Sequence, residues 1–261
     1  MAGGHVGVAV SGAIARIVLD QPAKRNAISS SMWRALELAA RQLAGRADVR
    51  AVVVSGAGEH AFSAGADIDE FGDSRSPVSA AAYDDLVEAA CQAIEALPQT
   101  CLAVIRGACA GAGNSIAASC DLRIAADDAY FSHPAVRLGL GYDSRGIARF
   151  ARVYGMSATR YLLLAGARLP ASRAHALGLV DELHAPDGLD DMAGAVAARA
   201  SRHAPLSVAA AKAALRALAF RPTDAQLQEA IDLARRADRS ADYEEGRRAF
   251  QEKREPRFEG R

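Results

Sequence analysis

The sequence predicts an α/β fold, and three observations lead to that prediction. Short runs of β-branched residues alternate along the chain with segments whose apolar residues recur at helical spacing. The chain has 261 residues, enough to bury a substantial core without disulfides or a structural metal. Hydrophobic residues make up 51% of it but aromatic residues only 5%, which favours a core of small aliphatic side chains packed by helices.

The first half of the chain supplies most of the predicted strands. Residues 6–10 and 14–19 flank a Ser-Gly turn and predict a hairpin. The serines at 29–31 can cap a helix whose apolar residues continue to Leu43. After it we expect a strand over 51–54, a long helix over 77–97, and strands over 102–105, 121–125 and 129–131.

The second half is mainly helical. Helices are expected over 187–203, 205–220 and 224–239, with a short extended piece at 178–183. No repeat or low-complexity linker divides the chain. We therefore expect a core over residues 1–200, and over residues 201–261 a helical C-terminal segment that covers the site and packs against neighbouring subunits.

Charge and cysteine content argue against several classes of protein. The 31 basic residues balance the 31 acidic ones, which gives no support for binding nucleic acid or an anionic membrane. No apolar run approaches the roughly 20 residues of a membrane span, and the N-terminus lacks the pattern of a signal peptide. Because the spacing of the four cysteines fits neither a zinc ribbon nor a redox motif, we expect them reduced and buried in a cytoplasmic protein without a metal.

Two loops of small residues could carry chemistry. Residues 62–68 and 106–114 each follow a predicted buried strand and are expected to lead into a helix. Small side chains let a ligand approach the backbone, and two free N–H groups at helix N-termini can hold an anion or an oxyanion. The alternative for either loop alone is tight packing of a helix on the sheet.

Six segments of the chain together resemble a known family. In chain order they are residues 20–27 (DQPAKRNA), 62–68 (FSAGADI), 107–113 (GACAGAG), 120–125 (CDLRIA), 178–181 (GLVD) and 245–254 (EGRRAFQEKR). In this order and spacing the chain resembles the enoyl-CoA hydratase/isomerase (crotonase) superfamily over nearly its whole length. The resemblance implies a spiral of ββα units with a helical C-terminal part, assembled as a homotrimer or a dimer of trimers.

The resemblance also implies a ligand and a way of holding it. The ligand is an acyl-CoA thioester, so coenzyme A enters as part of the substrate and no separate cofactor is expected. By position, the backbone N–H groups of Ala66 and Ala112 would polarise the thioester carbonyl. The resemblance implies that Lys24 and Arg25 bind the CoA phosphates. The segment from Ala64 through Asp67 to Ile68 would bind adenine and pantetheine. Phe250 and Lys253 would close the site. Surface charge and ordinary packing are the alternative for the last two and for Lys24 and Arg25.

The two glutamates that hydratases of this family use as acid and base are missing. The first should lie two residues past Gly113, where this chain has Ser115. The second should follow Pro134, where it has Ala135. A hydratase or isomerase mechanism in its usual form is therefore not supported.

Two titratable residues remain as candidates for catalysis. Asp143 matches a position where some family members place a catalytic aspartate, and it could act as acid, base or nucleophile. Its alternatives are a cap for a helix starting near Ser144 and an ion pair with Arg145. His133 titrates near neutrality and could be an acid–base partner, or it could be structural. Tyr142 could hydrogen-bond an acyl group or simply pack.

The sequence therefore predicts an acyl-CoA-processing enzyme that uses a backbone oxyanion hole, with Asp143 as its acid or base. One alternative is a catalytically reduced relative that binds acyl-CoA without converting it. The other is a thioester hydrolase or decarboxylase, which needs only the oxyanion hole and a placed water.

Overall fold

The structure is a computed structural model. It describes residues 4–71, 77–138, 142–166, 168–218, 228, 232–233, 236, 239–252, 254 and 256–261, with only the backbone at 68, 71, 77–80, 137–138, 244, 247 and 250–251. Within that part of the chain, no helix is both long and apolar enough to cross a membrane.

Two sheets form the centre of the molecule. The larger has the order β1-β2-β3-β5-β7-β10, with β1 and β2 antiparallel and the other neighbours parallel. Its strands are β1 His5–Ser11, β2 Ile14–Asp20, β3 Ala51–Gly56, β5 Thr100–Ile105, β7 Leu122–Ala126 and β10 Glu182–His184. The smaller sheet has the order β4-β6-β8-β9, and its strands are β4 Ala61–Ser63, β6 Ala108–Ala110, β8 Tyr130–Ser132 and β9 Leu169–Pro170.

The chain alternates between the two sheets, so it forms a spiral. A strand of the large sheet is followed by a short strand of the small sheet and then by helical structure. The helical segments are η1 Pro22–Lys24, α1 Ser30–Ala44, η2 Ile68–Phe71, α2 Pro77–Glu95, α3 Ala112–Ser119, η3 Ala135–Leu138, α4 Ser144–Val153, α5 Met156–Leu164, α6 Ala171–Ala176, η4 Pro186–Gly188, α7 Leu189–Ala200, α8 Pro205–Leu218 and α10 Ala241–Glu252. This arrangement confirms the predicted α/β spiral of ββα units.

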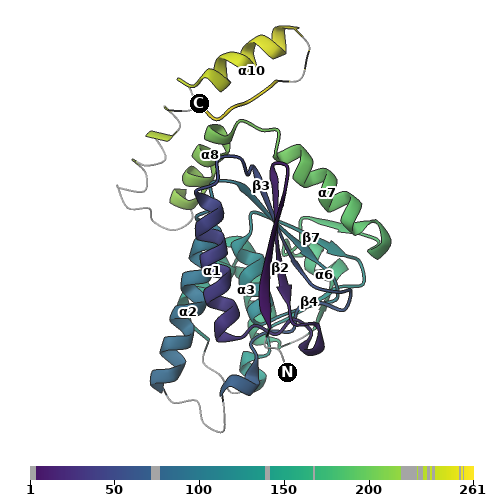
Figure 1. Cartoon of the computed structure of the whole chain (residues 1–261). Helices are drawn as coiled ribbons and strands as arrows, with labels where there is room; N and C mark the ends of the chain where they lie inside the picture. The colour runs from purple at the N-terminus through teal and green to yellow at the C-terminus, as the bar shows by residue number, and fades with distance from the viewer. Residues whose placement is uncertain are drawn as a thin grey trace.

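Helices cover both faces of the large sheet. Figure 1 shows α1 and α2 on one side of β2 and β3, and α7 on the other. The side chain of Ser29 accepts a hydrogen bond from the Met32 N–H and so begins α1, as its sequence predicts. Trp33 and Leu36 then pack into the core with no exposed surface. All four cysteines are unpaired and buried, as predicted.

The sequence prediction was wrong at two places in the strands. The loops at 62–68 and 106–114 contain residues of β4 and the whole of β6, which were not predicted. Both loops lead into helices as expected, the first into the short 3-10 helix η2 and the second into α3. The extended piece predicted over 178–183 is a strand only from Glu182 to His184, because Leu179 and Asp181 are instead tied to neighbouring segments by their own N–H groups. The helix predicted over 224–239 lies largely outside the described residues.

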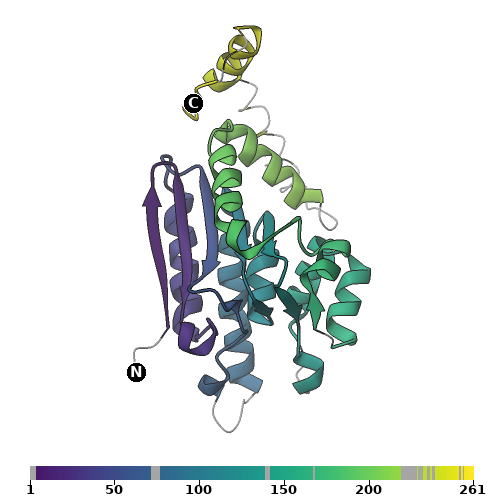
Figure 2. The ribbon, with the colours of Figure 1, turned by 90° about the vertical axis from the view of Figure 1, so that its right-hand side faces the viewer.

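The C-terminal region has two differently placed parts. Helix α8 is anchored on the core, because the Lys212 ammonium donates to the Gln99 carbonyl (2.8 Å) and to the Asp121 carboxylate (2.5 Å). Helix α10 lies apart from the sheets in both views (Figures 1 and 2). The proposed boundary near residue 200 stays a prediction.

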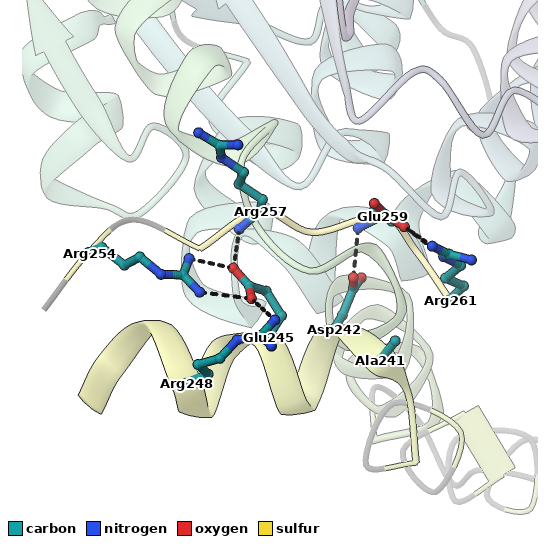
Figure 3. A pocket seen from close by; sticks show the side chains of 8 residues that line it. All are labelled: Ala241, Asp242, Glu245, Arg248, Arg254, Arg257, Glu259 and Arg261. Carbon is teal, nitrogen blue, oxygen red and sulfur yellow. Dashed lines mark hydrogen bonds and ion pairs between the residues drawn. The ribbon is translucent and has the colours of Figure 1, made fainter. Parts of the chain in front are cut away.

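The end of the chain folds back along α10. The Asp242 carboxylate accepts a hydrogen bond from the Glu259 N–H (2.6 Å), as Figure 3 shows. It also accepts one from the Gly260 N–H (2.8 Å). The Glu245 carboxylate accepts from the Arg254 guanidinium and from the Arg257 N–H. Two carboxylates of α10 thus hold the extended C-terminal residues against the helix.

Candidate functional site

An apolar-walled cavity of about 460 Å³ lies where the two small-residue loops meet. Of the residues predicted for the site, seven line it: Lys24, Ala64, Ala66, Asp67, Ala112, His133 and Asp143. A second cavity, of about 740 Å³, is bounded by the paired charges of α10 and the C-terminal tail (Figure 3). None of the predicted site residues whose side chains the structure describes lines that second cavity.

Glycines bring the two loops into contact. A Cβ on Gly111 would lie 3.6 Å from the Gly65 Cα, and a Cβ on Gly65 would lie 4.0 Å from the Ala112 nitrogen. Both glycines have positive φ, +116° at Gly65 and +45° at Gly111, a conformation that other residues rarely adopt. The backbone of residues 65–66 therefore lies against the start of α3.

The geometry leaves two N–H groups free at this contact. Ile28 pairs with the Gly65 carbonyl and the Asp67 N–H, so the Ala66 N–H between them points away from Ile28. Ala112 is the first residue of α3, where an N–H has no acceptor inside the helix. Neither N–H has a backbone acceptor among the described residues.

The predicted CoA-binding residues divide into three groups. Lys24 and Asp67 form an ion pair at 2.8 Å, and Lys24 also pairs with Asp69 at 2.8 Å. The hydrogen bond that the Lys24 ammonium donates to the Asp67 carboxylate is the main cause that raises the pKa of Lys24. Arg25 is exposed and does not line the cavity. The Ile68 and Phe250 side chains and the whole of Lys253 lie outside the described residues.

Asp143 caps a helix and lines the cavity at the same time. Its carboxylate accepts a hydrogen bond from the Arg145 N–H (3.0 Å), which begins α4. It also forms an ion pair with the Arg145 guanidinium (2.7 Å), which reaches Asp85 as well (2.8 Å). Both structural alternatives that the sequence offered for Asp143 are therefore present, and its part in catalysis stays a prediction.

His133 is buried in the cavity wall and is 3% exposed. Its ring meets Tyr142 edge-on, with the centroids 4.2 Å apart, and Phe150 at 5.6 Å. Neither ring nitrogen has a hydrogen-bond partner among the described residues. Burial lowers the pKa of His133 from 6.5 to about 4, so the imidazole is neutral at physiological pH.

The positions of the two missing glutamates also face the cavity. Ser115 and Ala135 both line it, and no carboxylate replaces them at those positions. The Ser115 hydroxyl is instead hydrogen-bonded to the Tyr142 hydroxyl at 2.8 Å. Burial raises the pKa of Tyr142, which keeps its hydroxyl protonated.

Sequence reasoning missed a buried ion pair in the cavity wall. The Arg149 guanidinium of α4 donates to Glu88 (2.9 Å) and Glu95 (2.7 Å) of α2. The only signal was spacing: Glu88 and Glu95 lie seven residues apart, which places them on one face of a helix. Trp33 and Tyr83 were missed as well; they line the cavity and share a hydrogen bond at 2.9 Å.

Known proteins resemble this chain over nearly its whole length. The profile of the enoyl-CoA hydratase/isomerase family matches residues 9–261. "Probable enoyl-CoA hydratase echA6" of Mycobacterium tuberculosis is 34% identical over 259 residues, covering 98% of this chain and 99% of that protein. The short-chain-enoyl-CoA hydratase of Clostridium acetobutylicum is 30% identical over 78% of each protein.

Solved structures agree with the sequence relatives. The crystal structure of an enoyl-CoA hydratase/carnithine racemase from Magnetospirillum magneticum superimposes with a TM-score of 0.92 at 33% identity, covering 98% of this chain and 96% of that one. A family protein from Hyphomonas neptunium gives 0.91 at 33% identity, covering 98% of each. This chain belongs to the enoyl-CoA hydratase/isomerase family.

Proposed function

We propose that the protein is an acyl-CoA-processing enzyme that holds the thioester oxygen between the N–H groups of Ala66 and Ala112. The observation that carries this proposal is the glycine contact between the two loops, which leaves both N–H groups free at the wall of one cavity. Donors fixed in this way stabilise the negative charge that develops on a thioester oxygen, whether the intermediate is an enolate or tetrahedral.

The CoA moiety is proposed to lie along residues 64–68. Ala64 is exposed at the cavity and has only a methyl side chain, so it leaves room for a ligand beside the backbone. Lys24 is the cation at this end of the cavity, and we propose that a CoA phosphate takes over part of its contact with Asp67 and Asp69.

Asp143 is proposed as the acid or base, because it is a carboxylate in the cavity wall beside the acyl end. The experiment that tests the reaction is mass-spectrometric turnover of a mixed panel of enoyl, dienoyl, hydroxyacyl, malonyl-type and aryl thioesters. A product mass would name the reaction class as hydration, hydrolysis or decarboxylation, and an isomerised product of unchanged mass would be recognised by its retention time.

Replacing Asp143 with Asn separates its two roles. Asparagine still caps a helix, so Asp143→Asn should fold normally. It cannot exchange a proton, and we expect turnover to fall by about 10²-fold or more. Full turnover by Asp143→Asn on the identified substrate would show that Asp143 is only a cap.

The oxyanion hole can be tested by removing one N–H. Proline is tolerated at the first position of a helix, so Ala112→Pro should keep α3 while deleting the donor. We expect kcat/KM to fall about 10²–10³-fold. Met156→Pro, at the first position of α5 and away from the cavity, is the matched control and should keep its activity. Equal activity in both proline variants would argue against the hole.

A second candidate function is acyl-CoA binding without turnover. The presence of Ser115 and Ala135 at the two glutamate positions favours it, together with the ion pair that holds Asp143. Acyl-CoA binding without any product across the panel would support it.

We further propose the trimeric assembly of the family, because apolar side chains such as Leu215 (68% exposed) and Leu218 (73%) stand on the surface of α8. Light scattering of the purified protein tests this assembly.

A further inference from the structure

We propose that the acyl group of the substrate carries a hydroxyl group, and that His133 and Tyr142 bind it. The proposal rests on the proposed function, since it names the class of thioester that the same cavity accepts. It concerns binding of the substrate as it arrives, because the two glutamates that would add a hydroxyl from water are absent.

His133 has hydrogen-bonding capacity that the described residues do not meet. A buried polar group without a partner costs the folded protein free energy, and such groups in native structures call for an explanation. Neither ring nitrogen of His133 has a hydrogen-bond partner among the described residues, and the residue lines the cavity. The Nη1 of Arg149, which lines the same cavity, is a further enclosed donor that has no hydrogen-bond partner in the described part of the chain.

The chemistry of a neutral histidine indicates which ligand group could hydrogen-bond to it. A neutral imidazole offers one N–H donor and one acceptor nitrogen. The pair of hydroxyls on Ser115 and Tyr142 lies beside it and can both give and accept a hydrogen bond. A hydroxyl group, which donates one hydrogen bond and accepts others, matches this wall.

The charges at the cavity favour a neutral group over an acidic one. The described side chains that line the cavity include five carboxylates, those of Asp67, Asp69, Asp84, Glu88 and Asp143. The same described lining includes two cations, Lys24 and Arg149, and both are already in ion pairs with these acids. A carboxylate on the acyl group would be repelled by this excess of acidic groups, whereas a neutral oxygen would not.

The acyl chain of a bound thioester would reach these polar side chains. Ser115 lies one turn of α3, about 5 Å, beyond Ala112. A thioester whose carbonyl oxygen is held at Ala112 therefore meets Ser115, Tyr142 and His133 with its acyl chain. Gly146 fixes the Tyr142 ring here, since a Cβ on Gly146 would lie 2.8 Å from the Tyr142 hydroxyl oxygen.

The test measures binding of four thioesters to the full-length protein by calorimetry: hexanoyl-CoA and its 3-, 4- and 5-hydroxy derivatives. We expect at least one hydroxylated thioester to bind about tenfold more tightly than hexanoyl-CoA. His133→Phe keeps an aromatic ring and removes both nitrogens, so the hydroxylated thioesters should lose their advantage over hexanoyl-CoA.

Tyr142→Phe provides a second variant, which should also lose the preference. Tyr154→Phe is the matched control: Tyr154 is buried and stacks on Phe150 in the same aromatic cluster, but it does not line the cavity. It should keep the preference. Thermal unfolding adds a readout, because removing two unsatisfied nitrogens should not lower the melting temperature, whereas removing a structural histidine would.

The outcomes separate the two proposals. If all four thioesters bind equally, or if His133→Phe and Tyr142→Phe keep the preference, this inference is overturned while the proposed function stands. If none of the four thioesters binds, the proposed function fails and the inference fails with it.

Discussion

At the scale of single residues, the cavity differs from its surroundings in how its polar groups are satisfied. Asn26, buried elsewhere in the core, donates to the carbonyls of Ala57 and Ala61 and accepts from the Gln21 N–H, so its amide is fully engaged. His133 is equally buried and has no such partner among the described residues. Residues that weaken the fold in this way are typical of sites kept for a ligand.

The unusual state of His133 predicts a pH dependence of stability. Its pKa is about 4 in the folded protein and 6.5 when exposed, so the unfolded chain takes up the proton first as the pH falls. The free energy of unfolding should therefore be highest above pH 6.5 and fall between pH 6.5 and 4, by up to about 3 kcal/mol. Denaturant unfolding at several pH values measures this.

His133→Phe serves as the comparison for that experiment, because it has no proton to gain. Its stability should change less between pH 6.5 and 4 than that of the wild type. His60→Phe, at an exposed loop position, should follow the wild type. Parallel curves for the wild type and His133→Phe would contradict the prediction.

At the scale of elements, the site depends on how closely α3 approaches β4. Gly113 allows this approach: a Cβ there would lie 2.9 Å from the Ser63 carbonyl oxygen and 3.1 Å from the Ser63 Cβ. Both neighbours belong to a buried strand that cannot yield as a flexible side chain would. The position of the Ala112 N–H is therefore set by a glycine one residue further along.

Gly113→Ala should move α3 away from β4. We expect a loss of stability of about 1–3 kcal/mol from the overpacking, together with weaker binding of acyl-CoA. Gly194→Ala in α7 is the matched control, because a Cβ there meets nothing within 4 Å. It should stabilise the protein by up to about 1 kcal/mol without affecting binding, as alanine favours a helix over glycine. Calorimetric binding and denaturant unfolding decide between these outcomes.

The element scale also shows how far the sequence could predict this fold. The apolar run at 51–54 is long enough to signal a buried strand, and it became β3. Strands β4 and β6 were missed because each has three residues and lies within a run of small residues that shows no alternation of apolar and polar side chains. The contact between Glu88 and Arg149 spans 61 residues, so no local pattern contains it.

The site was predictable to a different degree from the fold. The small-residue loops indicated where backbone N–H groups would be free, and the helix cap at Asp143 follows from its place before Ser144. The surroundings of His133 were not predictable, because they depend on residues from β8, α3 and the segment before α4 meeting in space.

At the scale of the whole molecule, the main body and α10 are held by different forces. The main body is a continuous apolar core that reaches from Ala15 to Ala200. Helix α10 has Ala249 buried, but its contacts with the tail are ionic and main-chain hydrogen bonds at Asp242 and Glu245. Salt and substitution of these acids should therefore affect α10 before they affect the body.

Asp242→Ala should release the tail from α10. The N–H groups of Glu259 and Gly260 lose their acceptor, and trypsin should cleave after Arg257 several times faster, while far-ultraviolet circular dichroism of the main body stays unchanged. Glu259→Gln, which removes only an exposed ion pair with Arg261, is the control and should be cleaved at the wild-type rate. Equal cleavage of both variants would show that Asp242 does not hold the tail.

The alkylation rates of the four buried cysteines report how often the surrounding structure opens. Burial raises the pKa of Cys91 to about 11 and raises that of Cys109 further, and the thiolate is the form that alkylating reagents attack. Alkylation therefore has to wait for the chain around each sulfur to open. Cys109 lies in β6 beside the start of α3, whereas Cys91 lies in α2. The alkylation rates of the two sulfurs would therefore report the local opening of these two regions separately. A tightly bound ligand should lower the alkylation rate of Cys109.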